Sequence, residues 1–468
     1  MRLGEVVAKT HILAIDIGSH KICAAVAEIG SNGALSVLGV GVKESQGVKK
    51  GMINNIDHAS LAAHSAINEA IRMAGVEVKK AIISIPSNYT ISMDSKGIVN
   101  LPHGEIRLTD IQRAMQTAIH NNPVPQDHQL IHALPYRFII DDMQVAIEDP
   151  INMSAHRLEC LVYMVTAKKS HLENLKKVIK NCEIEISDIV VSSYASSIAT
   201  ISDDERKGGV ACIDIGGGLC DIMIHNGQSM CYSDYLNVGS NNITLDLAQV
   251  FNLPLGVSEE IKTKYGNLIL TQEDQEKGLS APIKGMAEKQ PIPMESILSV
   301  LKARVDETLE LLNDILEKSA LKNLLTSGIV LTGGMVKLKN FEQYINQSGC
   351  FYGLSIRIAQ PKQLSGIFEK LQGPEYATII GLILHNAGRF TNYEVGINNE
   401  VKFKKLQTHQ GIEEVTLKQE KVVNNVQNLQ IKEQIVPKEM YRTDDLDTST
   451  KESTSLFKRF YKWLTQLF

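Results

Sequence analysis

The chain contains one short pattern twice, about two hundred residues apart. The first copy, AIDIGSHKICAAV, spans residues 14–26, and the second, CIDIGGGLCDIMI, spans residues 212–224. In each copy an apolar strand runs into Ile-Asp-Ile-Gly, a turn follows, and a second apolar strand begins. A repeated strand–turn–strand unit predicts two related α/β domains within one chain.

The segments that follow each copy repeat a longer order of elements. After the first copy we expect a third strand at 35–42 and a helix at 57–75, which ends at Gly75. After the second copy, a third strand is followed by the helical stretch NNITLDLAQVF at 241–251. Both halves therefore predict strand, glycine turn, strand, turn, strand and helix in that order.

Three further features belong to this plan. Residues 87–164 follow the strand AIISIP with a different texture and are predicted to form an inserted subdomain, with a helix at LTDIQRAMQTAIHN. A long amphipathic helix is expected at 294–318. The strand GIVL then leads to Thr332-Gly333-Gly334, a turn expected to open a helix, and a buried helix is expected at 375–388.

Composition excludes several classes of protein. The 468 residues are 43% hydrophobic with a net charge of −5, which gives no indication of nucleic-acid binding. The seven scattered cysteines have no zinc-ligand spacing and indicate reduced thiols in a cytoplasmic protein. No stretch reaches 18 uncharged apolar residues, and the N-terminus lacks the pattern of a signal peptide.

The two glycine turns have the chemistry of a phosphate site. A turn without a Cβ can take a positive φ and lets a ligand approach its backbone, whose N–H groups form an anion nest. Ser19 and Lys21 add a hydroxyl and a cation to the first turn. Asp16 and Asp214 would face the phosphates, where carboxylates are useful if a divalent cation lies between. We therefore expect one nucleotide between the domains, with Gly333 and Gly334 near its nucleoside.

The C-terminal residues have a different composition. Residues 391–452 are rich in Gln, Asn, Lys, Glu, Asp and Thr, which predicts a mostly disordered linker. Residues 453–468, STSLFKRFYKWLTQLF, predict an amphipathic helix with one apolar and one cationic face. Its expected role is to lie on an anionic membrane surface, and the alternative is docking on the protein's own core or on a partner. The expected membrane-binding residues are Leu456, Phe457, Lys458, Arg459, Phe460, Lys462, Trp463, Leu464, Leu467 and Phe468.

The repeated motifs and the third glycine turn resemble those of a known superfamily. AIDIGSHKICAAVAEI and CIDIGGGLCDIMI resemble the two phosphate loops of the actin/Hsp70/sugar-kinase superfamily, and IVLTGGMVKL resembles its adenosine motif. Within that superfamily the insert, the stretch DHQLIHALPYRFIID, the wording GIVLTGGM and the linker with its terminal helix are similar to the FtsA family of bacterial cell-division proteins. The resemblance covers about residues 10–390 and the tail.

The resemblance implies an actin-like fold, with duplicated ribonuclease H-like domains around a nucleotide cleft and an FtsA-type insert in place of the small actin subdomain. It divides the chain into subdomain 1A at 1–86 and 165–200, inserted subdomain 1C at 87–164, subdomain 2A at 201–225 and 301–390, subdomain 2B at 226–300, the linker at 391–452 and the membrane-targeting helix at 453–468.

The resemblance also implies a set of ATP-binding residues. They are Asp16, Gly18, Ser19, Lys21, Asp214, Gly216, Gly217, Gly218, Asp221, Gly239, Asn242, Glu259, Lys262, Gly333, Gly334 and Met335. Asp16 and Asp214 are expected to hold Mg²⁺ through water. The second loop departs from the usual pattern because Leu219 stands where the family has Thr. No residue is singled out as a catalytic base, so hydrolysis stays open, and any ATPase activity is expected to be slow.

The implied function is that of a cytoskeletal adaptor. Such a protein polymerises with itself on the cytoplasmic face of the inner membrane at the division site. It binds the C-terminal peptide of FtsZ, near Arg304 in this chain, and recruits later division proteins. The alternatives are a PilM-like pilus adaptor and a small-molecule kinase of the same fold. The kinase would need an acceptor pocket, and neither alternative accounts for the tail.

Overall fold

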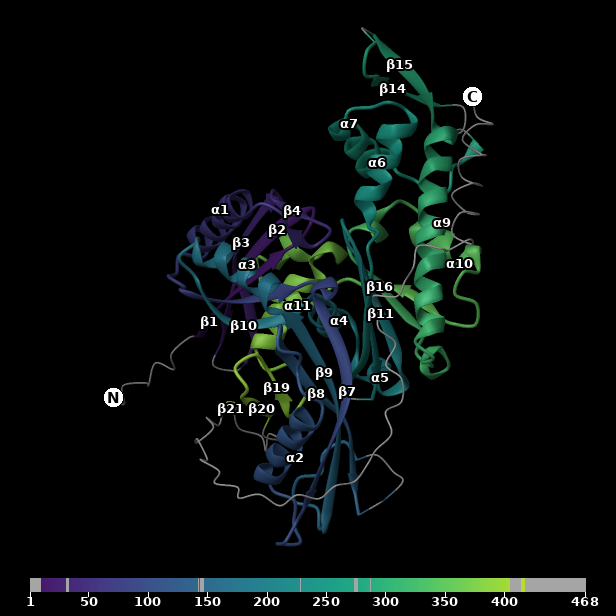
Figure 1. Ribbon diagram of the computed structural model, residues 1–468. Helices are drawn as coiled ribbons and strands as arrows, with labels where there is room; N and C mark the ends of the chain where they lie inside the picture. The colour runs from purple at the N-terminus through teal and green to yellow at the C-terminus, as the bar shows by residue number, and fades with distance from the viewer. Residues whose placement is uncertain are drawn as a thin grey trace, which may run out of the picture. The chain divides into compact units, whose positions relative to one another are not determined.

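The computed structural model describes residues 10–30, 33–141, 143, 147–227, 229–272, 277–286, 288–404 and 414–416 (Figure 1). The expected terminal helix at 453–468 lies outside the described residues, as does most of the expected linker. In the part of the chain that is described, no helix is both long enough and apolar enough to cross a membrane.

A six-stranded sheet holds the first copy of the repeated pattern. Its first three strands are antiparallel neighbours, and β1 is paired in parallel with β6, which is paired in parallel with β10. In sheet order the strands are β10 (Glu185–Val191), β6 (Lys80–Ile85), β1 (Thr10–Ile17), β2 (Lys21–Ile29), β3 (Leu35–Glu44) and β18 (Ser365–Gly366).

A five-stranded sheet holds the second copy and repeats this plan. In chain order, three antiparallel strands are again followed by two parallel ones. The first strand of the five lies between the second and the fourth in the sheet. In sheet order they are β13 (Ser229–Leu236), β12 (Cys220–Asn226), β11 (Val210–Ile215), β16 (Ile329–Thr332) and β17 (Ile356–Ile358). The shared strand order confirms the internal duplication predicted from the repeated pattern.

Helices pack on both sheets and bury them. The helix α1 packs on β2 and β3, and α11 packs on β1, β2 and β6. Parallel strands covered in this way are buried along most of their length, as the burial pattern of β6 shows. The helices are α1 (Ile56–Ala74), α2 (Leu108–Asn121), α3 (Lys169–Lys180), α4 (Ser192–Thr200), α5 (Asp203–Gly208), α6 (Ser240–Val250), α7 (Leu255–Glu260), α9 (Met294–Lys318), α10 (Phe341–Ser348) and α11 (Ala377–Asn386).

The expected helix ends are reproduced closely. Asn55 caps α1 by accepting a hydrogen bond from the His58 N–H, and Gly75 ends the helix in the left-handed region at φ 68°. The helices expected at 108–121 and 294–318 have those bounds in the structure. The turn after β16 was expected to open a helix, but a short 3-10 turn (η4, Met335–Lys337) follows it and α10 begins later.

The inserted residues form a third sheet, on which α2 packs. Its long strands are β7 (Thr90–Asn100), β8 (His128–Ile140) and β9 (Arg157–Lys168), and β9 is central, paired with both others. The strand β9 therefore continues beyond residue 164, where the sequence placed the end of the insert.

The same sheet contains residues that were expected to be disordered. The strand β19 (Glu394–Val395) pairs with β8, and β20 (Val401–Lys404) and β21 (Glu414–Thr416) extend the sheet from there. The prediction of a disordered linker is therefore wrong for 391–404 and 414–416. Composition misled here because a few buried side chains, such as Tyr393 and Val395, hold an otherwise polar segment in the core.

Two short hairpins and several single turns complete the described chain. The hairpins are β4 (Val48–Lys49) with β5 (Met52–Ile53) and β14 (Gly278–Pro282) with β15 (Lys289–Pro293). The turns other than η4 are η1 (Ser87–Tyr89), η2 (Ile261–Tyr265), η3 (Lys322–Leu324), η5 (Phe368–Leu371) and η6 (Pro374–Tyr376).

One glycine sets the distance between two buried helices. A Cβ at Gly381 of α11 would lie 1.8 Å from the carbonyl oxygen of Ala195 in α4. The two backbones are therefore in direct contact, and both helices are buried along almost their whole length.

We predict that Gly381→Ala lowers the free energy of unfolding by about 1–3 kcal/mol, because the added methyl forces α4 and α11 apart. Gly256→Ala is the control, since nothing lies within 4 Å of its Cβ position in α7. The control should match the parent or exceed it by up to about 1 kcal/mol. Urea unfolding followed by circular dichroism measures both variants, and equal stability of the two would contradict this packing.

Candidate functional site

The two repeated turns meet at one cleft. Its cavity has a volume of about 140 Å³. Most of the residues predicted from the two phosphate loops and the third glycine turn line it. They are Asp16, Gly18, Ser19, Lys21, Asp214, Gly216, Gly217, Gly218, Asp221, Gly333 and Gly334. This volume is below the 300–1,000 Å³ typical of small-molecule sites.

The two turns have the same internal hydrogen bond. The Gly18 N–H donates to the Lys21 carbonyl at 3.0 Å, and the Gly216 N–H donates to the Leu219 carbonyl at 3.0 Å. The turns also touch, since a Cβ at Gly218 would lie 2.5 Å from the Ser19 Oγ. Close approach is thus the reason for glycine here. The expectation that these turns need a positive φ is wrong, and φ is positive only in the third turn, at Gly333 (94°).

Three carboxylates lie at the cleft, of which Asp221 is buried and Asp16 and Asp214 are half-buried. Asp16 accepts a hydrogen bond from the Ser84 hydroxyl at 2.7 Å, and Asp214 accepts one from the Thr378 hydroxyl at 3.3 Å. Asp221 uses both oxygens within the protein, accepting from the Ser87 N–H and, through the other oxygen, from the Ser192 hydroxyl.

Burial and mutual repulsion disfavour the charged forms of these carboxylates. Desolvation raises the pKa of Asp16 and of Asp221. It also raises the pKa of Asp214 to about 7, with further contributions from the charges of Asp221 and Asp16. A cation between the turns would offset this repulsion, although no three acidic, His or Cys side chains of the described residues are grouped to hold a metal ion directly.

Lys21 contacts the segment that precedes α11. Its ammonium donates to the Glu375 carbonyl at 2.7 Å and lies 3.9 Å from the centre of the Tyr376 ring. Desolvation lowers the pKa of Lys21. The Lys21 side chain, which starts from β2, therefore lies at the edge of the cleft, and contacts with η6 hold its ammonium group there.

The residues expected on the ribose and purine side do not line the cavity, but some lie directly behind its wall. A Cβ at Gly239 would lie 2.5 Å from the Gly217 carbonyl oxygen, and the Gly239 N–H donates to the Asn242 side chain. Lys262 and Glu259 form an ion pair at 2.7 Å. The Lys262 ammonium also contacts the carbonyl of Ser240, a cleft residue, at 3.3 Å.

Three other residues were also singled out from the sequence. Met335 is buried in the core of the second domain. Leu219 lines the cleft, is largely buried, and its side chain lies against Gly51 in the β4–β5 hairpin. Arg304 binds both carboxylate oxygens of Asp246 at 2.6 and 2.9 Å, which ties α9 to α6.

Sequence reasoning missed several residues that line the cleft. Ser84 and Ser192 hold the carboxylates, Glu375 comes from η6, and Thr378 comes from the first turn of α11. Ser84 could have been singled out from the sequence, because it is a polar residue near the end of a strand that is otherwise apolar after Lys80. Thr378 could not have been singled out, since the helix that contains it was expected to be buried along its whole length.

Comparisons with known proteins decide the family. The family model described as cell division protein FtsA matches residues 211–381, and the model of the SHS2 domain inserted in FtsA matches residues 87–166. The FtsA of Helicobacter pylori strain 26695 is 36% identical over 416 residues, covering 82% of this chain and 84% of that protein. The chain belongs to the FtsA family of cell-division proteins.

More distant comparisons agree with this family. The FtsA of Pseudomonas aeruginosa is 30% identical over 374 residues, covering 80% of this chain and 88% of that protein. A chain of the solved PilM-PilN type IV pilus biogenesis complex has a TM-score of 0.57 at 16% identity and covers 80% of this chain and 98% of its own. The actin-like fold with duplicated domains and an FtsA-type insert is thereby confirmed. The FtsA relatives favour the cell-division role over the pilus-adaptor alternative.

We predict that Asp214→Asn raises the free energy of unfolding of nucleotide-free, metal-free protein near pH 7.5, by up to about 4 kcal/mol. The folded-state pKa of Asp214 is about 7, above its ordinary value of 3.8. Wild-type protein therefore loses stability as the pH rises from about 4 to 7, because unfolding then releases a proton. The amide variant escapes that loss.

Urea unfolding at pH 5 and pH 7.5, in buffer with a chelator, measures this difference. The gain of the variant over wild type should be smaller at pH 5 than at pH 7.5. A gain that is the same at both pH values, or a loss at pH 7.5, would contradict the burial of an ionised Asp214.

Proposed function

We propose that this chain is an ATP-binding, actin-like cell-division protein that polymerises on the cytoplasmic face of the inner membrane at the division site. One observation carries the nucleotide part. Two glycine turns, each led by a half-buried aspartate, meet across a single cleft. Backbone N–H groups in such turns suit phosphate oxygens, and Mg²⁺ held through water by Asp16 and Asp214 would reduce their repulsion.

The remaining expected ligand residues have supporting roles in this proposal. Gly239 and the Lys262–Glu259 pair lie behind Gly217 and Ser240, where they would support the ribose and purine side once the turns separate. Asp221 has both carboxylate oxygens engaged by protein donors. This arrangement gives Asp221 little freedom to act as a base, so any ATPase activity would be slow.

The division role follows from membership of the FtsA family. The body would bind the C-terminal peptide of FtsZ near Arg304, and the polymer would recruit later division proteins. Residues 453–468 would place the polymer on anionic lipid as a peripheral anchor, with Leu456, Phe457, Phe460, Trp463, Leu464, Leu467 and Phe468 in the interface and Lys458, Arg459 and Lys462 toward the headgroups. The subdomain division stated from the sequence forms part of the same proposal, except that the strands at 394–404 and 414–416 belong to the inserted sheet and β9 runs to Lys168.

The nucleotide site is tested by Gly218→Val. A branched side chain at this position meets the Ser19 side chain, so it would block the turn-to-turn space that phosphates require. We expect Mg-ATP affinity to fall at least about tenfold, measured by titration calorimetry. Gly256→Ala, with open space around its Cβ, should bind as wild type does. Unchanged affinity in a folded Gly218→Val variant would contradict the site.

The membrane anchor is tested by liposome co-sedimentation. Full-length protein should pellet with vesicles that contain anionic phosphatidylglycerol, and protein ending at Thr450 should stay in the supernatant. Neutral phosphatidylcholine vesicles serve as the control for charge. If both forms pellet equally, or if neither does, the tail is not the anchor.

A further inference from the structure

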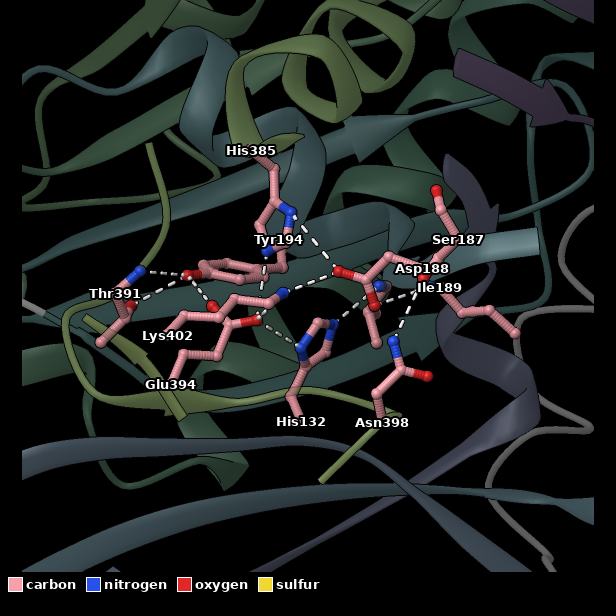
Figure 2. Close-up of polar contacts among 11 residues, drawn as sticks. His132, Ser187, Asp188, Ile189, Tyr194, His385, Thr391, Glu394, Asn398 and Lys402 are labelled. Carbon is pink, nitrogen blue, oxygen red and sulfur yellow. Dashed lines mark hydrogen bonds and ion pairs between the residues drawn. The ribbon is translucent and has the colours of Figure 1, made fainter. Parts of the chain in front are cut away.

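A fully buried carboxylate lies far along the chain from the cleft residues of the two repeats. Glu394 of β19 has no exposed surface, and Figure 2 shows its carboxylate surrounded by side chains from other elements. It accepts hydrogen bonds from His132 at 3.0 Å and from the Tyr194 hydroxyl at 3.0 Å. It is also 3.1 Å from the Nε2 of His385 and 3.3 Å from the Lys402 ammonium.

The surrounding groups keep this carboxylate charged. Burial alone would raise the pKa of Glu394, but Lys402, His385 and His132 hold it well below its usual range. His132 is fixed as well, because its Nε2 accepts from the Val191 N–H and its Nδ1 donates to Glu394. Removing any one partner would leave a buried charge less satisfied, which is costly in a protein interior.

The cluster joins side chains from separate elements of the fold. His132 belongs to β8 of the inserted sheet, Tyr194 to α4 and His385 to α11. Lys402 of β20 also pairs with Asp188 of β10 at 2.7 Å, in the first sheet. The contacts of Glu394 and Lys402 therefore hold the C-terminal residues against both the insert and the first domain.

Both helices that reach this cluster also reach the cleft. On α4, Ser192 donates to Asp221 at 3.0 Å, and Tyr194 follows two residues later. On α11, Thr378 donates to Asp214, and His385 lies seven residues further, about 10 Å along the axis. The helices cannot slide past each other freely, because Gly381 and Ala195 are in backbone contact.

The C-terminal residues 391–404, here called the strap, have few backbone bonds to the sheet that they join. The strand β19 pairs with β8 at one position, Val395 with Ala133. Side chains supply much of the remaining attachment. The Tyr194 hydroxyl, whose single proton goes to Glu394, lies 2.9 Å from the Thr391 hydroxyl and accepts from the Thr391 N–H at 2.8 Å, and Tyr393 donates to Asp149.

We propose that docking of the strap on the Glu394 cluster is coupled to nucleotide in the cleft through α4 and α11. This inference rests on the proposed function, since it takes Mg-ATP as the ligand. Mg-ATP that fixes Asp214 and Asp221 would fix Thr378 and Ser192, and with them the helix positions that carry His385 and Tyr194. Nucleotide then stabilises the docked strap, and the docked strap raises nucleotide affinity, because coupling between two binding equilibria is reciprocal.

The chain continues from the strap toward its C-terminal residues, so this coupling gives nucleotide an influence on the segment that leads to the tail. The proposed coupling involves the strap alone among the C-terminal residues. It requires no change in the two glycine turns other than the movement that admits a nucleotide. It also assigns a role to Tyr194, whose hydroxyl contacts both Thr391 and Glu394.

Two variants of the full chain test the coupling. Tyr194→Phe removes the hydroxyl alone, and Glu394→Gln removes the charge while keeping the shape. The control is Glu159→Gln, a buried carboxylate on β9 that pairs with Lys96 and touches neither α4 nor α11 through any described contact. Circular dichroism establishes that each variant is folded, and Tyr194→Phe suffices if Glu394→Gln is not.

We expect Tyr194→Phe to lower Mg-ATP affinity about fivefold or more, with Glu159→Gln unchanged. In wild type, a non-hydrolysable ATP analogue with Mg²⁺ should slow hydrogen exchange in residues 391–404, and in Tyr194→Phe this protection should shrink. If wild type binds Mg-ATP but its strap exchanges equally with and without nucleotide, or if Tyr194→Phe binds as wild type does, the coupling is wrong and the proposed function stands. If wild type does not bind Mg-ATP, both fail.

Discussion

The structure brings three carboxylates together where its two repeated domains meet, with Asp221 buried and Asp16 and Asp214 half-buried. Carboxylates so placed repel each other and are poorly solvated, which raises the pKa of Asp214 to about 7. Such an arrangement is unfavourable for stability, and carboxylates with perturbed pKa values cluster at functional sites. The hydroxyls of Ser84, Ser192 and Thr378 hold the three carboxylates in place.

Much of the fold could be predicted from the sequence because the same pattern of strands and glycine turns occurs in both halves of the chain. Hydrophobic strands, glycine turns and the order of elements repeat, and the structure has the same strand order in both sheets. Local signals also located α1, since Asn55 and Gly75 are strong caps. The C-terminal strands could not be predicted in this way. Their stability comes from buried long-range contacts, such as Glu394 with His132, which no local composition reveals.

The residues of the site likewise fall into a group that the sequence predicts and a group that it does not. Its glycines and aspartates stand in a motif, and the structure brings Asp16, Asp214 and their turns together. The residues that hold the carboxylates come from the ends of other strands and helices, where a single serine or threonine carries no signal. The reason for glycine also needed the structure, because at Gly217 and Gly218 it is proximity to the opposite turn, with no requirement for an unusual φ.

The most direct test of a single shared cleft is the stoichiometry and magnesium dependence of ATP binding to the full chain, measured by titration calorimetry. We expect one nucleotide per chain, because both turns close on a single cleft, and an affinity at least about tenfold lower when a chelator removes Mg²⁺. Two nucleotides per chain, none, or an affinity indifferent to Mg²⁺ would contradict it.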